Sequence, residues 1–452
     1  MGLGTGKVSR AVSSHWFGTD WIEESAMEKR RLGLVSVNSV IQAEVTFDEC
    51  HYSVRFGEFQ TEDRMKTNNL DLAELVAADV SRLLEDKLGM GYVEMHDHEN
   101  QLKEGQDRKG FLLKLSPSSF KHLKTLSGSR SQLDLESIYF LNLNGLESIT
   151  DSEADFLGQH RGFLCLDSLP SLTYIQAVSL SKQKGDLALD GINSLSQEIA
   201  KALSTHTGDI YLNGLNKVSD ESAEALSSMK CNLHLNGLHN ISEAVAEALA
   251  KHNRGLYLDG LTDLPEEIAR PLTEHNGPLS LGGLSCLSVE IAEILANHVG
   301  KLSLDGLQFL SDEAAQILSE KHGDISLGNL RHISDEAATA LARVRGGLSF
   351  SSLEQLPERL AEVLSHHQGE LSLGGFQSLS DSAAKSLAKH NGDLYLDDLT
   401  TISHSAAEFL STHQGALNLY GIMELSNAAL LSLEKHEGFL GLNDVVYAME
   451  CA

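Results

Sequence analysis

Cysteine is scarce in this chain of 452 residues, and the cysteines that do occur are scattered. They are Cys50, Cys165, Cys231, Cys286 and Cys451. An odd number without metal-ligand spacing argues against a disulfide framework and against a cysteine-based zinc site. Free thiols fit a reducing compartment, so the composition predicts a cytoplasmic protein.

Long apolar runs are also missing. Residues 1–34 contain no run of signal-peptide length, and no stretch approaches the roughly 20 apolar residues of a membrane-spanning helix. The sequence likewise has no HExxH, CxxC, nucleophile-elbow or dinucleotide-binding motif. We therefore expect a protein without a membrane span, without a cofactor or metal, and without enzymatic activity.

Basic residues are few relative to acidic ones: 35 Lys and Arg stand against 64 Asp and Glu, for a net charge of −29. Most of the excess lies in residues 141–452, where 18 basic and 42 acidic residues give −24. A surface this negative repels phosphate backbones and attracts cationic groups. The charge predicts a cationic or neutral partner and argues against nucleic acid.

What the sequence does have is a period of 23 residues. A pair of apolar residues, one position apart, recurs from Leu141/Leu143 to Leu417/Leu419 without insertion or deletion, and Leu440 begins the next unit. A fixed period of about 20 to 50 residues is typical of a solenoid, in which each unit buries its apolar side against its neighbours. The alternation of apolar and polar residues within each pair predicts a short strand.

The rest of a unit, as in residues 302–324, predicts a turn, a helix and a second turn. Gly306 follows the strand, where a tight turn favours a residue without a β-carbon. Ser311 stands where a helix N-cap is expected, and Ala315 lies on the buried face of a helix of roughly three turns. Gly323 is expected to end this helix, because Gly is the usual residue just past a helix C-terminus.

The resulting pattern, LxLxxLxx(L/I)(S/T)(D/E)xxAxxL, resembles a leucine-rich repeat. It is most similar to the cysteine-containing and bacterial subclass that carries Ile-Thr-Asp before the helix, as residues 149–151 do here. The resemblance implies an α/β solenoid, a leucine-rich-repeat arc of about 13 strand-turn-short-helix units. The turn position that holds Asn or Cys in many such repeats holds Leu146, Leu330 or Phe376 here. We therefore expect the buried asparagine hydrogen-bond ladder to be missing.

A different pattern precedes the repeats. Val40–Phe47 and Tyr52–Phe56 are predicted strands, and Asp71–Lys87 is a predicted amphipathic helix. Together with Phe56-Gly57-Glu58 and the Gly-Tyr-Val-Glu of residues 91–94, they resemble the WGR domain, a small α+β module. The resemblance implies a docking domain and, as an alternative function for the chain, a WGR-dependent nucleic-acid-associated regulator. Phe-Gly-Glu in place of Trp-Gly-Arg, and a net charge of −8 over residues 35–98, argue against the nucleic-acid role.

These patterns divide the chain into five segments. We expect a poorly ordered arm over residues 1–34, a WGR-like domain over 35–98, and a linker with an N-terminal cap over 99–140. Thirteen leucine-rich repeats then cover residues 141–439, and a C-terminal cap covers 440–452. The caps are needed because an end repeat would otherwise expose its core.

A histidine recurs 19 residues after the first apolar residue of most units: His160, His206, His252, His275, His298, His367, His390, His413 and His436. Stacked repeats would align them in a column with neighbours about 5 Å apart. A metal ladder is one interpretation, but no carboxylate or cysteine recurs beside them to complete a site. The alternative, which we favour, is that each ring hydrogen-bonds the last carbonyls of its helix. Protonation of such a column should loosen the solenoid below about the ordinary His pKa of 6.5.

Residues between and just after the paired leucines point away from the core, onto the concave side if the strands line it. The candidate partner-binding residues are Asp190, Tyr211, Asn213, His234, Asn236, Tyr257, Asp259, Asp305, Tyr395, Asp397 and Tyr420. Aromatic groups beside carboxylates on a rigid sheet are typical of protein-recognition surfaces, although Tyr and Ser also suit exposed strand positions.

The sequence thus predicts a non-enzymatic intracellular scaffold that holds a protein or peptide along the concave strand face. The alternative is the WGR-dependent regulator, and an enzyme is the third and weakest hypothesis. A cationic or tyrosine-complementary ligand would suit the strand face best.

Overall fold

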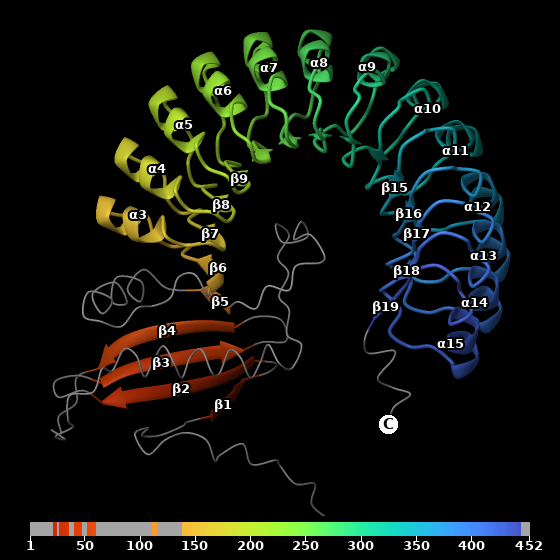
Figure 1. Cartoon of the computed structure of the whole chain (residues 1–452), viewed down its shortest axis with the longest axis horizontal. Coiled ribbons are helices and arrows are strands. Elements are labelled where there is room, and N and C mark those ends of the chain that lie inside the picture. Colours follow the sequence, from red (N-terminus) through yellow and green to blue (C-terminus); the bar gives the residue numbers. More distant parts are fainter. Residues whose placement is uncertain are drawn as a thin grey trace, which may run out of the picture. The chain divides into compact units, whose positions relative to one another are not determined.

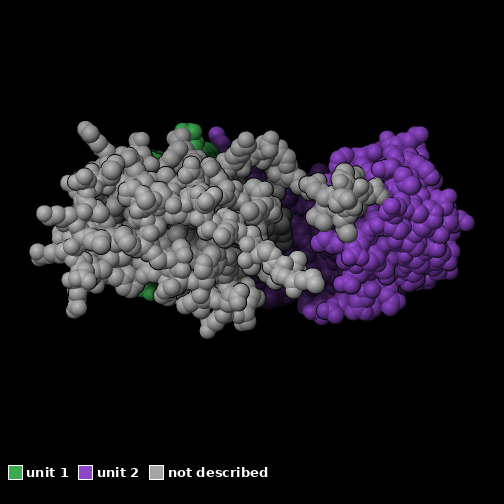
Figure 2. Space-filling view, turned by 90° about the horizontal axis from the view of Figure 1, so that it is seen from below, with its two compact units in different colours: residues 1–192, 205–210 green, residues 193–204, 211–452 purple. Residues whose placement is uncertain are grey.

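A computed structural model describes residues 21–24, 27–35, 40–47, 52–59, 111–114 and 138–443, with side chains for residues 140–443. The chain divides into two compact units, which are residues 1–192 with 205–210 (unit 1) and residues 193–204 with 211–452 (unit 2) (Figure 2). The described strands form two sheets. One has four strands in the order β1-β2-β3-β4, and the other has fifteen in the order β5 to β19.

Strand and helix alternate through the repeats (Figure 1). The strands are β5 (Phe111–Lys114), β6 (Ile138–Asn142), β7 (Phe163–Cys165), β8 (Leu187–Ala188), β9 (Ile210–Tyr211), β10 (Leu233–His234), β11 (Leu256–Tyr257), β12 (Leu279–Ser280), β13 (Leu302–Ser303), β14 (Ile325–Ser326), β15 (Leu348–Phe350), β16 (Leu371–Leu373), β17 (Leu394–Tyr395), β18 (Leu417–Leu419) and β19 (Leu440–Leu442). The helices are α3 (Asp151–Leu157), α4 (Tyr174–Leu180), α5 (Gln197–Leu203), α6 (Asp220–Ser227), α7 (Glu243–Ala250), α8 (Glu266–Thr273), α9 (Val289–Leu295), α10 (Asp312–Leu318), α11 (Asp335–Leu341), α12 (Glu358–Leu364), α13 (Asp381–Leu387), α14 (His404–Leu410) and α15 (Asn427–Leu433).

The 23-residue period sets the register of the sheet. Leu256 pairs with Leu279, and Leu279 pairs with Leu302, in parallel strands. Because the period never slips, each apolar pair lies on the pair of the preceding unit, and these side chains are fully buried. The prediction of an α/β solenoid of strand-turn-helix units is confirmed by this pairing.

The helices begin where the sequence predicts. Ser311 accepts a hydrogen bond from the backbone N–H of Ala314 at the start of α10. Ser or Thr takes this position at every described helix except α8 and α12, where Pro265 and Pro357 precede the first turn. The acceptor satisfies one of the N–H groups that a helix start leaves unpaired.

The helices end earlier than expected. Each has only seven or eight residues, about two turns, so the prediction of three turns is wrong. In α10 the helix ends at Leu318, and Lys321, three residues later, is fully buried. The chain must therefore leave the helix axis early to bring this side chain inward.

The repeated glycines have a different role from the one expected. Among the described residues only Gly145 and Gly375 have positive φ, so Gly323 does not end α10 in a left-handed conformation. At Gly306 an added β-carbon would lie 2.0 Å from the carbonyl oxygen of Gly282 in the preceding unit. Gly is required there because neighbouring turns approach closely, and not because the turn itself is strained.

The core lies between the strand layer and the helix layer, where Leu304, Ala315 and Leu318 are fully buried. Neighbouring strands are about 4.8 Å apart, whereas packed helices need 8–10 Å, so the helix side of a stack is the longer one. Within unit 2 the strands accordingly line the inner side of a curve and the helices its outer side (Figure 1).

The first sheet lies before the repeats. It contains β1 (Trp21–Glu24), β2 (Met27–Val35), β3 (Val40–Phe47) and β4 (Tyr52–Phe59), paired antiparallel. Strands β3 and β4 match the two predicted strands, while β1 and most of β2 fall in residues 1–34, for which little order was expected. The predicted helix Asp71–Lys87 lies outside the described residues, so the WGR resemblance stays a prediction.

The predicted domain boundaries also stay predictions, although strands extend beyond the thirteen repeats. Strand β5 lies in the segment expected to be a linker and cap, and it pairs with β6. Strand β19 lies in the expected C-terminal cap and continues the repeat register, with Leu417 opposite Leu440.

Candidate functional site

The side of the sheet opposite the helices, here called the strand face, carries the residues between the paired leucines. The structure brings three predicted site residues together there. The ring centroids of Tyr211 and His234 are 4.1 Å apart, and those of His234 and Tyr257 are 4.0 Å apart, with nearly parallel planes. Tyr211 and His234 are buried and Tyr257 is half-buried. In-register pairing of β9, β10 and β11 produces this aromatic stack.

The residues just after the second leucine of each pair form a hydrogen-bond ladder. Oδ1 of Asn213 accepts the backbone N–H of Asn236 at 3.0 Å, and Oδ1 of Asn236 accepts that of Asp259 at 2.9 Å. Asp259 in turn accepts the N–H of Gly282 at 2.7 Å. The predicted site residues Asn213, Asn236 and Asp259 therefore also join successive repeats.

The expectation of a missing ladder is thus only partly right. Leu146 and Leu330 fill the usual asparagine position and are buried, but the ladder is displaced toward the strand. A second ladder lies at the N-terminal ends of the strands, where Asn232 accepts the N–H of Gly255 at 2.8 Å and Asp324 accepts that of Gly347 at 2.7 Å. An Asn or Asp that recurs beside several of the strands is the signal that could have predicted both ladders.

Asn236 provides a direct test of the first ladder. Replacing Asn236 with Ala leaves the N–H of Asp259 without its acceptor and should lower the free energy of unfolding by about 1–2 kcal/mol. Asn236→Asp should change it by less than about 0.5 kcal/mol, because an Asp accepts the same bond at position 259. Urea unfolding monitored by circular dichroism measures both, and equal losses in the two variants would contradict the ladder's role.

The ladder of side-chain acceptors is interrupted where a small residue follows the second apolar residue of the pair. Gly328, Ser351 and Gly374 occupy this position in consecutive units. There β15 and β16 extend to three residues, and the N–H of Gly374 bonds the carbonyl of Phe350 at 2.7 Å. Backbone pairing replaces the side-chain acceptor, and the small residues project less from the strand face at this point.

A hollow of about 440 Å³ lies on the strand face over β11 to β15. It is lined by Asp259, Ser280, Gly282, Ser303, Asp305, Gly328, Asn329, Ser351 and Ser352. Its two carboxylates are held in fixed orientations. Oδ1 of Asp305 accepts bonds from the hydroxyl of Ser326 and the N–H of Gly328, both at 2.6 Å, and Oδ2 accepts one from Ser303. Sequence reasoning identified Asp259 and Asp305 but not the serines and glycines that make the floor.

The remaining predicted residues lie elsewhere. Asp190 follows β8, and Tyr395, Asp397 and Tyr420 belong to β17, β18 and the turns after them. Tyr395 is half-buried and Tyr420 is exposed, and the N–H of Tyr420 donates to Asp397 at 3.4 Å. The cluster of Tyr395, Asp397 and Tyr420 begins two strands beyond β15, where the hollow ends, so the predicted set is not one contiguous site.

The histidines after the helices do form a buried column, but their contacts differ from those expected. His275 Nδ1 lies 2.7 Å from the carbonyl oxygen of His252 in the preceding unit, and its Nε2 lies 3.2 Å from that of Pro278 in the following loop. The expectation that each ring caps its own helix is therefore wrong for His275. The ring is buried between two repeats because the helix has already ended, and it joins the turns on either side.

The metal interpretation of the column gains no support. No group of three or more His, Cys, Asp or Glu side chains within the described ranges is placed to hold a metal ion. Burial lowers the pKa of His206, His252, His275 and His367 below the ordinary value. The rings are therefore neutral near pH 7.

One thiol lies on the strand face of unit 1. Cys165 donates to Oδ2 of Asp167 at 2.7 Å, and burial, followed by the negative charge of Asp167, raises the thiol pKa well above its usual range. A thiol held protonated is a weak nucleophile.

No helix in the described part of the chain is long and apolar enough to cross a bilayer.

A 23-residue unit of parallel strand, turn and short helix, with leucines filling the space between the layers, defines a leucine-rich-repeat solenoid. No protein-family model and no curated protein matches the chain. Among solved structures, an internalin from Listeria monocytogenes is similar over 64% of this chain and 88% of its own, with 17% identity and a TM-score of 0.36. A leucine-rich repeat protein from Leptospira interrogans is similar over 79% of this chain and 90% of its own, with 19% identity and a TM-score of 0.35. Because these scores are low, the fold assignment rests on the repeat geometry of the chain itself.

Proposed function

We propose that the chain is a non-enzymatic interaction scaffold whose strand face in unit 2 binds a peptide segment of a protein partner. The observation that carries the proposal is the hollow over β11 to β15, where two oriented carboxylates border a floor of Ser and Gly. Small side chains let a peptide backbone approach the sheet closely, and Tyr257 lies two residues before Asp259 on the same face.

The charge of the hollow favours a cationic segment. Asp259 receives the hydroxyl of Ser280 at 2.5 Å and the N–H of Gly282 at 2.7 Å on the same oxygen, Oδ1. Its Oδ2 has no hydrogen bond to any residue that the structure describes, so it can accept one from Lys or Arg. A carboxylate already held in place loses little conformational freedom on binding.

A peptide display library selected on the full chain tests this proposal. We expect the selected peptides to be enriched in Lys or Arg. Replacing Asp259 and Asp305 with Asn keeps the hydrogen-bond acceptors of the ladder but removes two charges, and it should weaken binding of a selected peptide about tenfold. Isothermal titration calorimetry gives the dissociation constants.

The matched control is Asp263→Asn with Glu313→Gln, which removes two charges from exposed positions outside the hollow. It should change affinity less than twofold in 0.15 M salt, because exposed charges beyond a Debye length are screened. Equal weakening in the two double variants would place the charge effect outside the hollow and contradict the proposal.

We also propose a reducing, cytoplasmic location, which the free thiols of Cys165, Cys231 and Cys286 support.

A further inference from the structure

The buried position after each helix is interrupted in unit 2. The residues there, 23 apart, are Met229, His252, His275, His298, Lys321, Val344, His367, His390, His413 and His436. All are buried, including Lys321 and Val344. The histidines therefore form two runs, a first run from His252 to His298 and a second run from His367 to His436.

Within each run the imidazole rings face one another. Centroids are 6.0 Å apart for His252 and His275 and 6.1 Å apart for His275 and His298, and the planes are nearly parallel. The second run has the same geometry, with separations of 5.9 to 6.1 Å. A positive charge on one ring would thus lie about 6 Å from the centre of the next ring.

In the first run, the ring of His275 lies between two acceptors. Both nitrogens of His275 face carbonyl oxygens, whereas a neutral imidazole has only one N–H to donate. A protonated ring could donate to both oxygens. The local hydrogen bonds of His275 therefore favour its charged form, while burial opposes it.

Burial and neighbouring charge have the larger effect in the native state. Burial, followed by the positive charges of Lys321 and His275, lowers the pKa of His298 to about 4. Burial, followed by His367 and His413, lowers the pKa of His390 to about 4. Burial, followed by the charge of His436, lowers the pKa of His413, against a weaker opposing effect of Asp393. The first run and the rings from His367 to His413 are thus neutral at pH 7, and a ring that takes up a proton repels a second proton on its neighbour.

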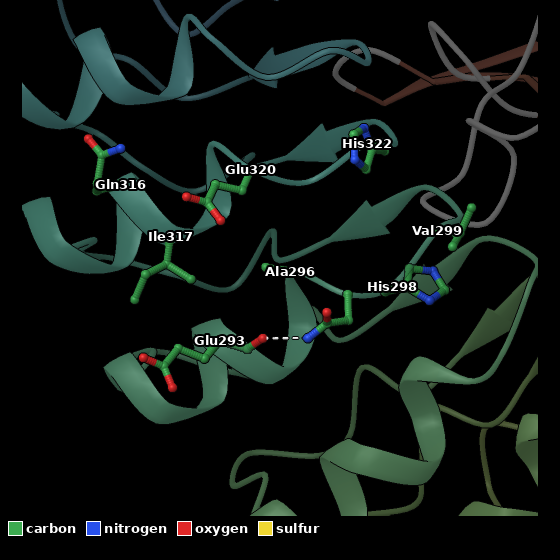
Figure 3. A pocket seen from close by; sticks show the side chains of 9 residues that line it. Glu293, Ala296, His298, Val299, Gln316, Ile317, Glu320 and His322 are labelled. Atoms are coloured by element: carbon green, nitrogen blue, oxygen red, sulfur yellow. Dashed lines mark hydrogen bonds between the residues drawn. The ribbon is translucent and has the colours of Figure 1, made fainter.

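Two hollows between helices reach the first run. One, of about 430 Å³, lies between α9 and α10 and is lined by His298 with Glu293, Glu320 and His322 (Figure 3). The other, of about 530 Å³, lies between α7 and α8 and is lined by His252 with Glu247, Lys251, Arg270 and Glu274, among others. These hollows bring water and acidic side chains next to the buried rings, so protons can reach the column without unfolding of the whole unit.

We propose that the two histidine runs are an acid-sensitive device that opens unit 2 locally, between repeats, when the rings take up protons. Like charges about 6 Å apart in a buried layer repel, and separation of adjacent repeats would let water reach them. Repeats that carry Val344 or Met229 at this position lack a titrating ring. The opening therefore begins within the two runs, and repeat proteins can open locally because each unit contacts only its neighbours.

Hydrogen exchange of the full chain at pH 7.5 and pH 5.0, corrected for intrinsic rates, tests the proposal. A ring with a native pKa near 4 and an unfolded pKa of 6.5 destabilises the closed state about 30-fold between these pH values. Amides of α7 to β13 and of α12 to β19 should lose protection by at least this factor. Amides of α11, beside Val344, should lose several times less.

A glutamine variant separates protonation from structure. Gln183 occupies the same position in unit 1, where its Nε2 donates to the carbonyls of Gly162 and Asp186, 21 residues before it and three residues after it. His252→Gln with His275→Gln and His298→Gln should therefore keep the donors without the titration. Amides of the first run should then keep their protection at pH 5.0, while the second run still loses it.

The exposed His239 and His366 provide the control, because their replacement with Gln should leave the acid response unchanged. If the triple variant does not fold, His298→Met replaces it, since Met229 is accommodated at the same position with 1% exposure. This single variant should restore most of the protection of α9 and β13 at pH 5.0. An acid loss spread evenly over all repeats, or a first run that responds to acid without its histidines, would overturn the proposal.

Discussion

Gly346→Ala should lower the free energy of unfolding by about 3 kcal/mol, whereas Gly347→Ala, at the next residue, should change it by less than about 1 kcal/mol. A β-carbon on Gly346 would lie 2.4 Å from the carbonyl carbon of Gly323 and 2.5 Å from the backbone nitrogen of Asp324. A β-carbon on Gly347 would meet only ordinary contacts, the nearest at 3.5 Å. Neither glycine has positive φ, so backbone strain does not distinguish them.

The two variants form a matched pair because they are adjacent and make the same chemical change. The contacts of Gly346 are backbone atoms of the preceding repeat, which cannot rotate away, so the two repeats must separate. Urea unfolding of the full chain gives the change in stability, and hydrogen exchange of β14 and β15 shows whether the damage is local. Similar losses in both variants would mean that the close approach of the turns does not limit stability.

Lys321→Met should raise the free energy of unfolding by about 2 kcal/mol at pH 7. Lys321 is fully buried in the column, and its Nζ donates to the carbonyl oxygen of Gly300 at 2.6 Å. Burial lowers its pKa from 10.5 to about 8, against a weaker opposing effect of Asp324. That shift corresponds to about 3 kcal/mol of destabilisation of the charged form, and the lost hydrogen bond offsets about 1 kcal/mol of the gain. Met229 indicates that this position accommodates a methionine.

The pH dependence of this gain identifies its cause. Between pH 8 and pH 10.5 the unfolded chain keeps the lysine proton while the native state has lost it, so the wild type becomes more stable as pH rises. The advantage of the methionine variant should therefore shrink by about 2 kcal/mol between pH 7 and pH 9.5. An advantage that stays constant with pH would mean that packing, and not the buried charge, explains it.

Lys389→Met is the control for Lys321→Met. Lys389 is exposed and immediately precedes His390, so its replacement removes the same kind of charge from the surface beside the column. Surface substitutions of this kind usually change stability by less than about 0.5 kcal/mol. A comparable gain in this variant would indicate a general effect of net charge.

The strands and the helix starts were predictable because they depend on local pattern. A slip of one residue would turn every Leu of a strand toward water, so the exact 23-residue recurrence allows only one register. Ser311 likewise follows from local chemistry, since its hydroxyl bonds an N–H three residues later. Helix length was not predictable in the same way, because it depends on where Lys321 must turn into the core.

The strand face was predicted only in part. Tyr211, His234 and Tyr257 stack because in-register strands bring equivalent positions together. The hollow depends instead on small Ser and Gly residues in neighbouring units, which only the assembled sheet brings together. The roles of Asn236 and Asp324 in joining repeats also depend on atoms that are 23 residues away along the chain.

By itself the sequence determined the repeat unit, its register, the apolar core and the acidic surface, because each depends on residue order and composition alone. Only the tertiary structure decided the close contacts of the glycine turns, the two ladders and the carbonyl environment of the buried histidines. These features arise between repeats, where the distances between atoms are set by the packing of strands against strands and helices against helices.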